Sequence, residues 1–235
     1  MAQTLHPFAK YIQILARGKT KTRAFTMDEA QEAMAMILRG DAKPEQIGAF
    51  LMLLRLKEET PEEIAGFTLG TRDTFDLPAI IPSVDVDWSS YAGKRRQLPW
   101  FILSALLLAQ NGFKVFMHGT GGHTPGRIYT RETLQKLGFP IANSFDQAIT
   151  HLERSNFAYV PLQALSPKLR ELIEMRPIFG LRSPVHSFSR MLNPFNAPVM
   201  MQGIFHRGFM DIHAGAGLLD RKSTRLNSSH ISISY

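Results

Sequence analysis

Residues 84–119, which read VDVDWSSYAGKRRQLPWFILSALLLAQNGFKVFMHG, decide how this chain folds. The stretch opens with alternating valines that predict a short strand at residues 84–86, and an apolar run at residues 98–110 predicts a buried helix. A β-rich segment at residues 113–117 then predicts a second strand. The alternation of helices and strands continues at residues 130–137, 145–154 and 157–160. This rhythm predicts a mainly parallel α/β sheet, with ligands bound in the loops that follow its strands.

Short helices are expected before this sheet. Thr26 with Glu29, and Thr60 with Glu63, have the spacing of capping boxes, in which each side chain bonds the other residue's backbone at the start of a helix. Leu77-Pro78 and Ile81-Pro82 then break the helical pattern. We therefore expect a small helical domain over residues 1–78, followed by an incomplete, mainly parallel α/β domain over residues 79–219.

Composition excludes several classes of function. The 235 residues include no cysteine, so a disulfide framework, a thiolate nucleophile and a cysteine metal site are all excluded. The N-terminal segment lacks the apolar core of a signal peptide, and the longest apolar run is too short to span a bilayer, so we expect a cytoplasmic protein that does not contact membranes. The net charge of +7 favours polyanionic or phosphorylated partners.

The C-terminal residues have a different character. Residues 220–230 read DRKSTRLNSSH, which is also the translation of a common sequencing-library adapter, and serine dominates the last residues of the chain. We expect residues 220–235 to be an artefactual or disordered tail and the natural reading frame to have continued past Leu219. Without the three basic residues and one acid of this tail, the net charge falls from +7 to +5.

The loop after the first strand is the main candidate site. It carries aromatic and basic side chains close together, namely Trp88, Tyr91, Lys94, Arg95 and Arg96. Positive charge near a phosphodiester backbone releases counterions, and aromatic rings stack on bases without sequence preference, so the loop fits nucleic acid. The alternative is an ordinary solvated basic loop.

A second loop lies at residues 118–127. Arg127 and Arg131, at its end and at the start of the next helix, would extend the same basic surface; the alternative is that they are ordinary surface arginines. The histidines at 186, 206 and 213 lack metal-ligand spacing with any carboxylate, so we predict no metal site.

Several motifs together resemble anthranilate phosphoribosyltransferase and the wider glycosyltransferase family 3. They are the helical domain, the strand-loop-helix at residues 84–110, the His118-Gly119 turn, MRPIFGLR at residues 175–182 and LNP at residues 192–194. The resemblance implies a nucleoside-phosphorylase/phosphoribosyltransferase fold and a homodimer formed through the N-terminal helices. It also implies ligand positions at Ser90, Gly93, His118, Gly119 and Arg176, the last for the carboxylate of anthranilate.

The sequence departs from the family pattern at the diphosphate loop. Family members have G-T-G-G-D where residues 88–96 read WSSYAGKRR, and an acidic pair that would hold magnesium has no counterpart before Leu219. The resemblance is closer to a divergent branch that keeps the fold and binds nucleic acid non-specifically. We therefore expect non-specific binding of DNA or RNA, with no catalytic residues and no cofactor. The alternative is a phosphoribosyltransferase that uses phosphoribosyl pyrophosphate, an aromatic amine or base, and Mg²⁺; whether the chain is an enzyme stays open.

Overall fold

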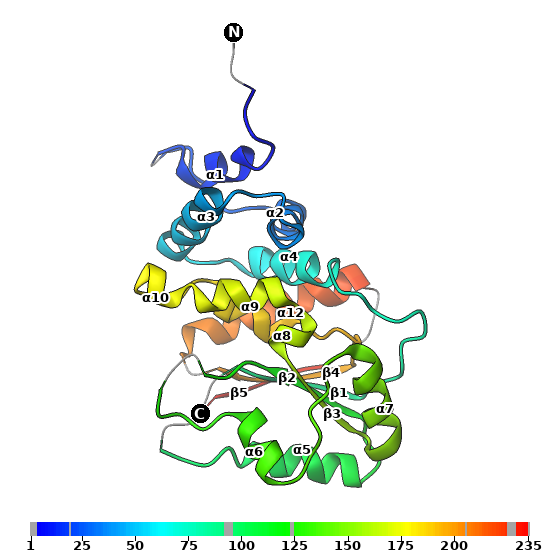
Figure 1. Ribbon diagram of the computed structural model, residues 1–235. Coiled ribbons are helices and arrows are strands. Elements are labelled where there is room, and N and C mark those ends of the chain that lie inside the picture. Colours follow the sequence, from blue (N-terminus) through cyan, green and yellow to red (C-terminus); the bar gives the residue numbers. More distant parts are fainter. Residues whose placement is uncertain are drawn as a thin grey trace.

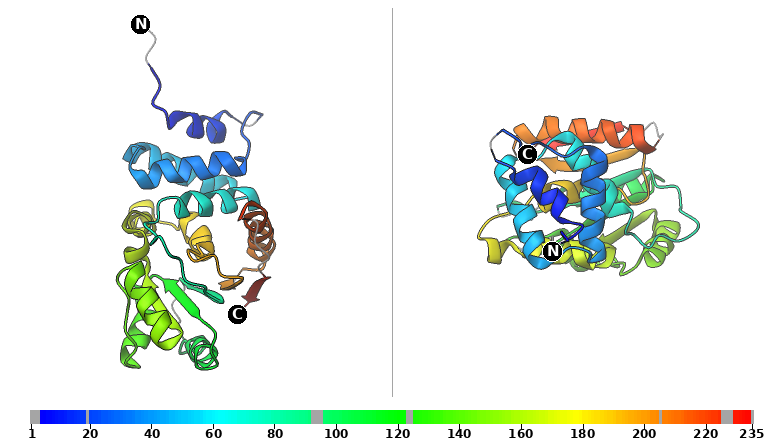
Figure 2. Two further views of the ribbon diagram at one scale, coloured as in Figure 1. Left: turned by 90° about the vertical axis from the view of Figure 1, so that its right-hand side faces the viewer. Right: turned by 90° about the horizontal axis from the view of Figure 1, so that it is seen from above.

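The computed structural model describes residues 4–18, 20–91, 96–122, 125–204, 206–224 and 229–234. Four N-terminal helices form a unit at one end, a parallel sheet lies at the other, and further helices lie between them (Figure 1). The view turned by 90° shows the same order of layers (Figure 2). The predicted fold class, a helical domain followed by a parallel α/β sheet, is therefore confirmed.

The N-terminal helices are α1 (Ala9–Ala16), α2 (Met27–Arg39), α3 (Pro44–Lys57) and α4 (Pro61–Arg72). Both predicted capping boxes are present, because the Thr26 hydroxyl accepts from the backbone N–H of Glu29 and the Thr60 hydroxyl from that of Glu63. The buried Glu63 carboxylate also accepts from the N–H of Phe25 at 2.9 Å and from Lys57 Nζ at 2.7 Å. The first bond ties the start of α4 to the segment that enters α2, and the second ties it to the end of α3.

Helices from the second half of the chain complete the helical core. They are α8 (Leu162–Leu165), α9 (Pro167–Glu174), α10 (Arg176–Phe179), α11 (Val185–Phe188), the 3₁₀ helix η1 (Ser189–Met191) and α12 (Gly208–Thr224). Phe67 on α4 packs against Phe188 on α11, with ring centroids 5.6 Å apart. The main hydrophobic cluster runs from α1 to α12. The helical layer and the layer that covers the sheet thus share one core.

The sheet consists of β1 (Val86–Ser90), β2 (Val115–Gly119), β3 (Phe157–Pro161), β4 (Val199–Ile204) and β5 (Ser229–Ser234), all parallel, in the order β3-β2-β1-β4-β5. Helices α5 (Phe101–Gln110), α6 (Thr130–Lys136) and α7 (Phe145–Ser155) follow the strands, and α5 and α6 cover the face away from the helical unit (Figure 1). Ser90 of β1 is in register with Gly119 of β2, and Gly119 with Pro161 of β3. The carboxyl ends of these strands therefore meet at one edge.

The first strand differs from its prediction, since it spans Val86–Ser90 rather than residues 84–86. All five of its residues are buried, because the strand is central and covered on both faces. An apolar pattern does not predict the whole strand, because three of its residues are polar: Asp87, Ser89 and Ser90. Ser90 consequently ends the strand instead of beginning a loop.

The expected tail also differs. Helix α12 continues through Asp220 to Thr224, and the Arg72 guanidinium donates from both terminal nitrogens to the Asp220 carboxylate at 2.7 Å. Residues 229–234 pair with β4. The expectation that residues 220–235 lack regular structure is therefore wrong for residues 220–224 and 229–234. Their origin in an adapter stays a prediction.

Candidate functional site at the carboxyl edge of the sheet

A buried hydrogen-bonded chain links the ends of the two central strands. The Tyr91 hydroxyl lies 2.8 Å from His118 Nδ1, and His118 Nε2 lies 3.1 Å from Asp87 Oδ1. A neutral imidazole protonated on Nε2 satisfies both bonds, with the Tyr91 hydroxyl donating to Nδ1 and Nε2–H donating to the carboxylate. Burial, and then the charge of Asp87, raise the pKa of Tyr91 well above its ordinary value of 10.0, so its hydroxyl keeps the proton that it donates.

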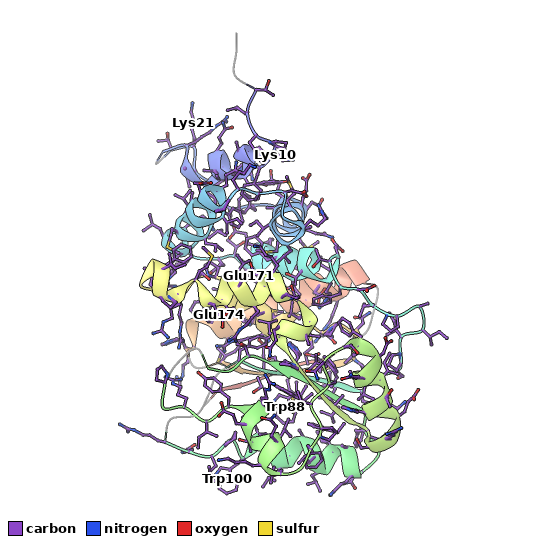
Figure 3. The ribbon with its side chains drawn as sticks, viewed as in Figure 1. Lys10, Lys21, Trp88, Trp100, Glu171 and Glu174 are labelled. Carbon is purple, nitrogen blue, oxygen red and sulfur yellow. The ribbon has the colours of Figure 1, made fainter. Side chains whose placement is uncertain are left out.

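The aromatic residues Trp88 and Tyr91 are buried, so their expected role in binding is not possible. Tyr91 is 4% exposed and Trp88 is 5% exposed, and Trp88 stacks on Phe101 with ring centroids 6.1 Å apart. Figure 3 shows Trp88 inside the body of the sheet domain. Neither ring presents a face to solvent, so the expectation that they stack on bases is wrong. His118, which the resemblance gave as a ligand position, is likewise buried between Tyr91 and Asp87.

Two more residues that the resemblance gave as ligand positions, Ser90 and Gly119, make close contacts at the ends of these strands. The Ser90 hydroxyl shares a short hydrogen bond with the Thr130 hydroxyl at the start of α6. A Cβ atom added to Gly119 would lie 1.9 Å from the carbonyl oxygen of Ser90, so only glycine fits this close approach of β1 to β2. Ser90 and Gly119 therefore lie side by side and contact other parts of the protein, and their expected role as ligand positions stays a prediction.

The basic loop is described only in part. Gly93, Lys94 and Arg95 lie outside the described residues, so the expectation for these positions stays a prediction. Arg96 is exposed. Trp100, four residues later and just before α5, is 62% exposed, and Figure 3 shows it at the outer surface. In the sequence, the buried rings of Trp88 and Tyr91 thus precede the basic residues 94–96, and the accessible ring of Trp100 follows them.

Four arginines gather at this edge, and we name them the arginine cluster: Arg127, Arg176, Arg182 and Arg190. Partial burial, and then the nearby positive charges of Arg176 and Arg127, lower the pKa of Arg182. Burial, and then the charge of Arg182, lower the pKa of Arg190. No carboxylate of the described residues forms an ion pair with Arg182 or Arg190. Arg182 and Arg190 therefore add positive charge to this edge that no carboxylate of the described residues pairs with directly.

The predicted positions Arg127 and Arg176 belong to this cluster, whereas Arg131 has other neighbours. The charge of Arg131 acts with that of Arg170 on the buried phenol of Tyr159 on β3. Arg170 donates from Nη1 to the carbonyl oxygen of Gly121 at 3.0 Å and pairs with Glu174. Sequence reasoning missed Arg182 and Arg190, although the MRPIFGLR motif includes Arg182. Nothing in the sequence indicates that Arg182 lies near Arg127 or that Arg190 lies near Arg182.

The residues at this edge do not fit a magnesium site. Mg²⁺ takes oxygen ligands, chiefly carboxylates together with water or phosphate. In the part of the chain that the structure describes, no three His, Asp or Glu side chains lie together in a way that could hold a metal ion. Among the described helices, none combines the length and the apolar character that a membrane span requires.

Comparison with known proteins agrees with this architecture. The sequence model for "Glycosyl transferase family, helical bundle domain" matches residues 9–75. The chain is 29% identical over 197 residues to "Uncharacterized protein YbiB" of Escherichia coli (strain K12), covering 80% of this chain and 59% of that protein. It is 26% identical over 218 residues to the anthranilate phosphoribosyltransferase of Dictyoglomus thermophilum, covering 92% of this chain and 63% of that enzyme. In sequence the chain is thus anthranilate phosphoribosyltransferase-like.

Solved structures show the same fold. Anthranilate phosphoribosyltransferase from Thermus thermophilus superposes with a TM-score of 0.80 at 21% identity, over 98% of this chain and 66% of that one. The enzyme from Saccharomyces cerevisiae in complex with PRPP and Mg superposes with a TM-score of 0.73 at 14% identity, over 97% of this chain and 66% of that one. The chain spans about 60% of the length of the curated relatives given above.

Proposed function

We propose that this protein binds DNA or RNA without sequence preference through the carboxyl edge of its sheet. The observation that supports this most is the arginine cluster, in which Arg182 and Arg190 lie among further positive charges and form no ion pair within the described residues. Such a concentration of charge attracts a phosphate backbone and releases its counterions. Lys94, Arg95 and Arg96 would add to the same binding surface.

Trp100 is the better candidate for base stacking. It is 62% exposed and lies four residues after Arg96, whereas the rings of Trp88 and Tyr91 are buried. Stacking of a base on an accessible aromatic ring contributes about 1–3 kcal/mol and tolerates any base. Single-stranded nucleic acid, whose bases are free to stack, is therefore expected to bind more tightly than a duplex.

The test is a salt titration of binding to a fluorescent single-stranded oligonucleotide. The variant carries Lys94→Ala, Arg95→Ala and Arg96→Ala together, and the control carries the same loss of charge at exposed Arg17, Lys43 and Arg154. If the three loop residues each contact one phosphate, the slope of log K against log salt falls by about 2 in the variant, from about 0.7 per contact. Equal slopes in the loop variant and the control would contradict the loop assignment.

A phosphoribosyl transfer reaction is the second candidate, because relatives that carry that name align over most of this chain. Against it, the strand ends where the family grips diphosphate are closed by internal contacts of Ser90, Gly119 and Tyr91. Release of pyrophosphate from phosphoribosyl pyrophosphate and Mg²⁺, in the presence of anthranilate or another aromatic amine, would establish this activity. Self-association through the N-terminal helices stays a prediction, which light scattering on the purified protein tests.

A further inference from the structure

The arginine cluster converges from segments far apart in the chain. Arg127 lies between β2 and α6, Arg176 begins the short helix α10, Arg182 follows that helix, and Arg190 lies in η1. Figure 1 shows α10 on the same side of the molecule as the loops that leave β1 and β2. The charges of Arg176 and Arg127 act on Arg182, and the charge of Arg182 acts on Arg190, so Arg182 lies among the other three.

Arg190 is held in place by main-chain acceptors. Its Nη1 donates to the carbonyl oxygen of Gly203 in β4, and its Nε donates to the carbonyl oxygen of His186 at 3.2 Å. A side chain fixed in this way loses little further freedom when an anion binds. Arg182, by contrast, is exposed and makes no hydrogen bond with the other described residues through its side chain. One arginine is therefore anchored to the sheet and its neighbour is available to a ligand.

Two buried hydroxyl groups lie next in sequence to residues of this edge, one after β2 and one after Arg182. The Thr120 hydroxyl, directly after β2, is on a side chain 2% exposed, and the Ser183 hydroxyl, next to Arg182, is on one 6% exposed. Neither hydroxyl has a hydrogen-bond partner among the residues that the structure describes. A buried hydroxyl without a partner costs free energy that a ligand oxygen can recover.

We propose that the arginine cluster takes a phosphate monoester, the group that ends a 5′-phosphorylated nucleic-acid strand, in preference to an internal phosphodiester. A phosphodiester has one charge and two free oxygens, whereas a monoester carries about 1.5–2 negative charges at neutral pH and three acceptor oxygens. The available fork of Arg182, supported by the positive charges near it, matches the second better than the first. This inference rests on the proposed function, because it names the part of the nucleic acid that the same edge selects.

The experiment compares one single-stranded sequence with a 5′-phosphate and with a 5′-hydroxyl, by fluorescence anisotropy with the label at the 3′ end. The wild-type protein is expected to bind the phosphorylated strand about tenfold more tightly, the size of one added charge-assisted contact. Arg182→Gln is expected to remove this preference, and Arg182→Lys to remove most of it, because lysine keeps the charge but not the fork. Arg154 is exposed and lies in the last turn of α7, just before β3, so it is at the opposite ends of the strands. Arg154→Gln is the matched control and is expected to keep the preference.

Equal binding of the two strands by the wild-type protein would overturn the inference while leaving the proposed function standing. A preference that survives in Arg182→Gln would also overturn it. If neither strand binds, the proposed function fails, and adenosine 5′-monophosphate measured against adenosine by calorimetry then decides about the anion site. Binding of the monophosphate alone, lost in Arg182→Gln, would support a site for free nucleotides; no binding of either would overturn the site.

Discussion

Replacing Tyr91 with phenylalanine removes one hydroxyl from the buried chain of Tyr91, His118 and Asp87 and leaves the ring in place. The lost bond is 2.8 Å long, and its acceptor, Nδ1 of His118, lies on a side chain with no exposed surface. An acceptor left unsatisfied in this way costs about 1–3 kcal/mol of unfolding free energy. In a chain of this size each kcal/mol lowers the melting temperature by roughly 2–4 °C.

The assay is thermal unfolding followed by circular dichroism, with Tyr159→Phe as the matched control. Tyr159 is also buried, but its hydroxyl makes no hydrogen bond with the other residues that the structure describes. Tyr159→Phe is therefore expected to lower the melting temperature less than Tyr91→Phe. If Tyr91→Phe is as stable as the wild-type protein, or if the control loses equally, the buried chain does not contribute as argued.

The same variant changes the response to alkaline pH. The pKa of Tyr91 is raised in the folded protein, chiefly by burial, above the value of 10.0 that applies to the unfolded chain. Its contribution to stability is therefore complete below pH 10.0 and is lost as the pH rises toward the folded-state pKa. Tyr91→Phe is expected to lose less stability than the wild-type protein over that range. Parallel losses would contradict the raised pKa.

Three further predictions concern other parts of the chain. The hydrogen bond with Arg23 is the main cause that lowers the pKa of Glu29 to about 2. Glu29→Gln should therefore lower the free energy of unfolding by about 0.5 kcal/mol at neutral pH. In denaturant titrations this difference should vanish as the pH falls from 4.5 to about 2. Gly70→Ala would put a Cβ 2.2 Å from a carbonyl oxygen of α2 and should lower the free energy of unfolding by about 3 kcal/mol. Gly48→Ala would put a Cβ 3.9 Å from its nearest neighbour and should raise the free energy of unfolding by about 0.5–1 kcal/mol in the same titrations. Iodide should quench the fluorescence of Trp100 and not that of buried Trp88, so Trp100→Phe should leave emission that iodide hardly quenches.

The features that the sequence predicts well are local ones. A capping box depends on two residues three positions apart, so Thr26 with Glu29 and Thr60 with Glu63 could be identified without knowing the fold. The extent of β1 could not be predicted in this way, because the polar residues of a strand buried on both faces take partners from distant segments, as Asp87 Oδ1 does from His118.

The candidate site was predictable only in part for the same reason. Arg127 and Arg176 were candidates from their loops and from the family resemblance, but Arg182 and Arg190 join them only when α10, α11 and η1 fold back over the strand ends. Whether an aromatic residue near a basic run faces solvent also depends on tertiary packing. Tyr91 is buried and Trp100 is exposed, although both flank the same run.

The closed strand ends determine what kind of binding this edge can perform. Ser90 bonds Thr130, and Gly119 packs against the Ser90 carbonyl, so these two strand ends are used in internal contacts. Exposed Arg182 is a charged donor at the same edge that a ligand can reach. Binding by side-chain charge weakens steeply with salt when the ligand is a string of phosphodiesters. A guanidinium fork on one terminal phosphate is screened less, because its partner is in direct contact and partly desolvated. Raising the salt concentration should therefore weaken overall affinity while increasing the ratio between 5′-phosphorylated and 5′-hydroxyl strands, which separates a convergent anion site from a merely basic surface.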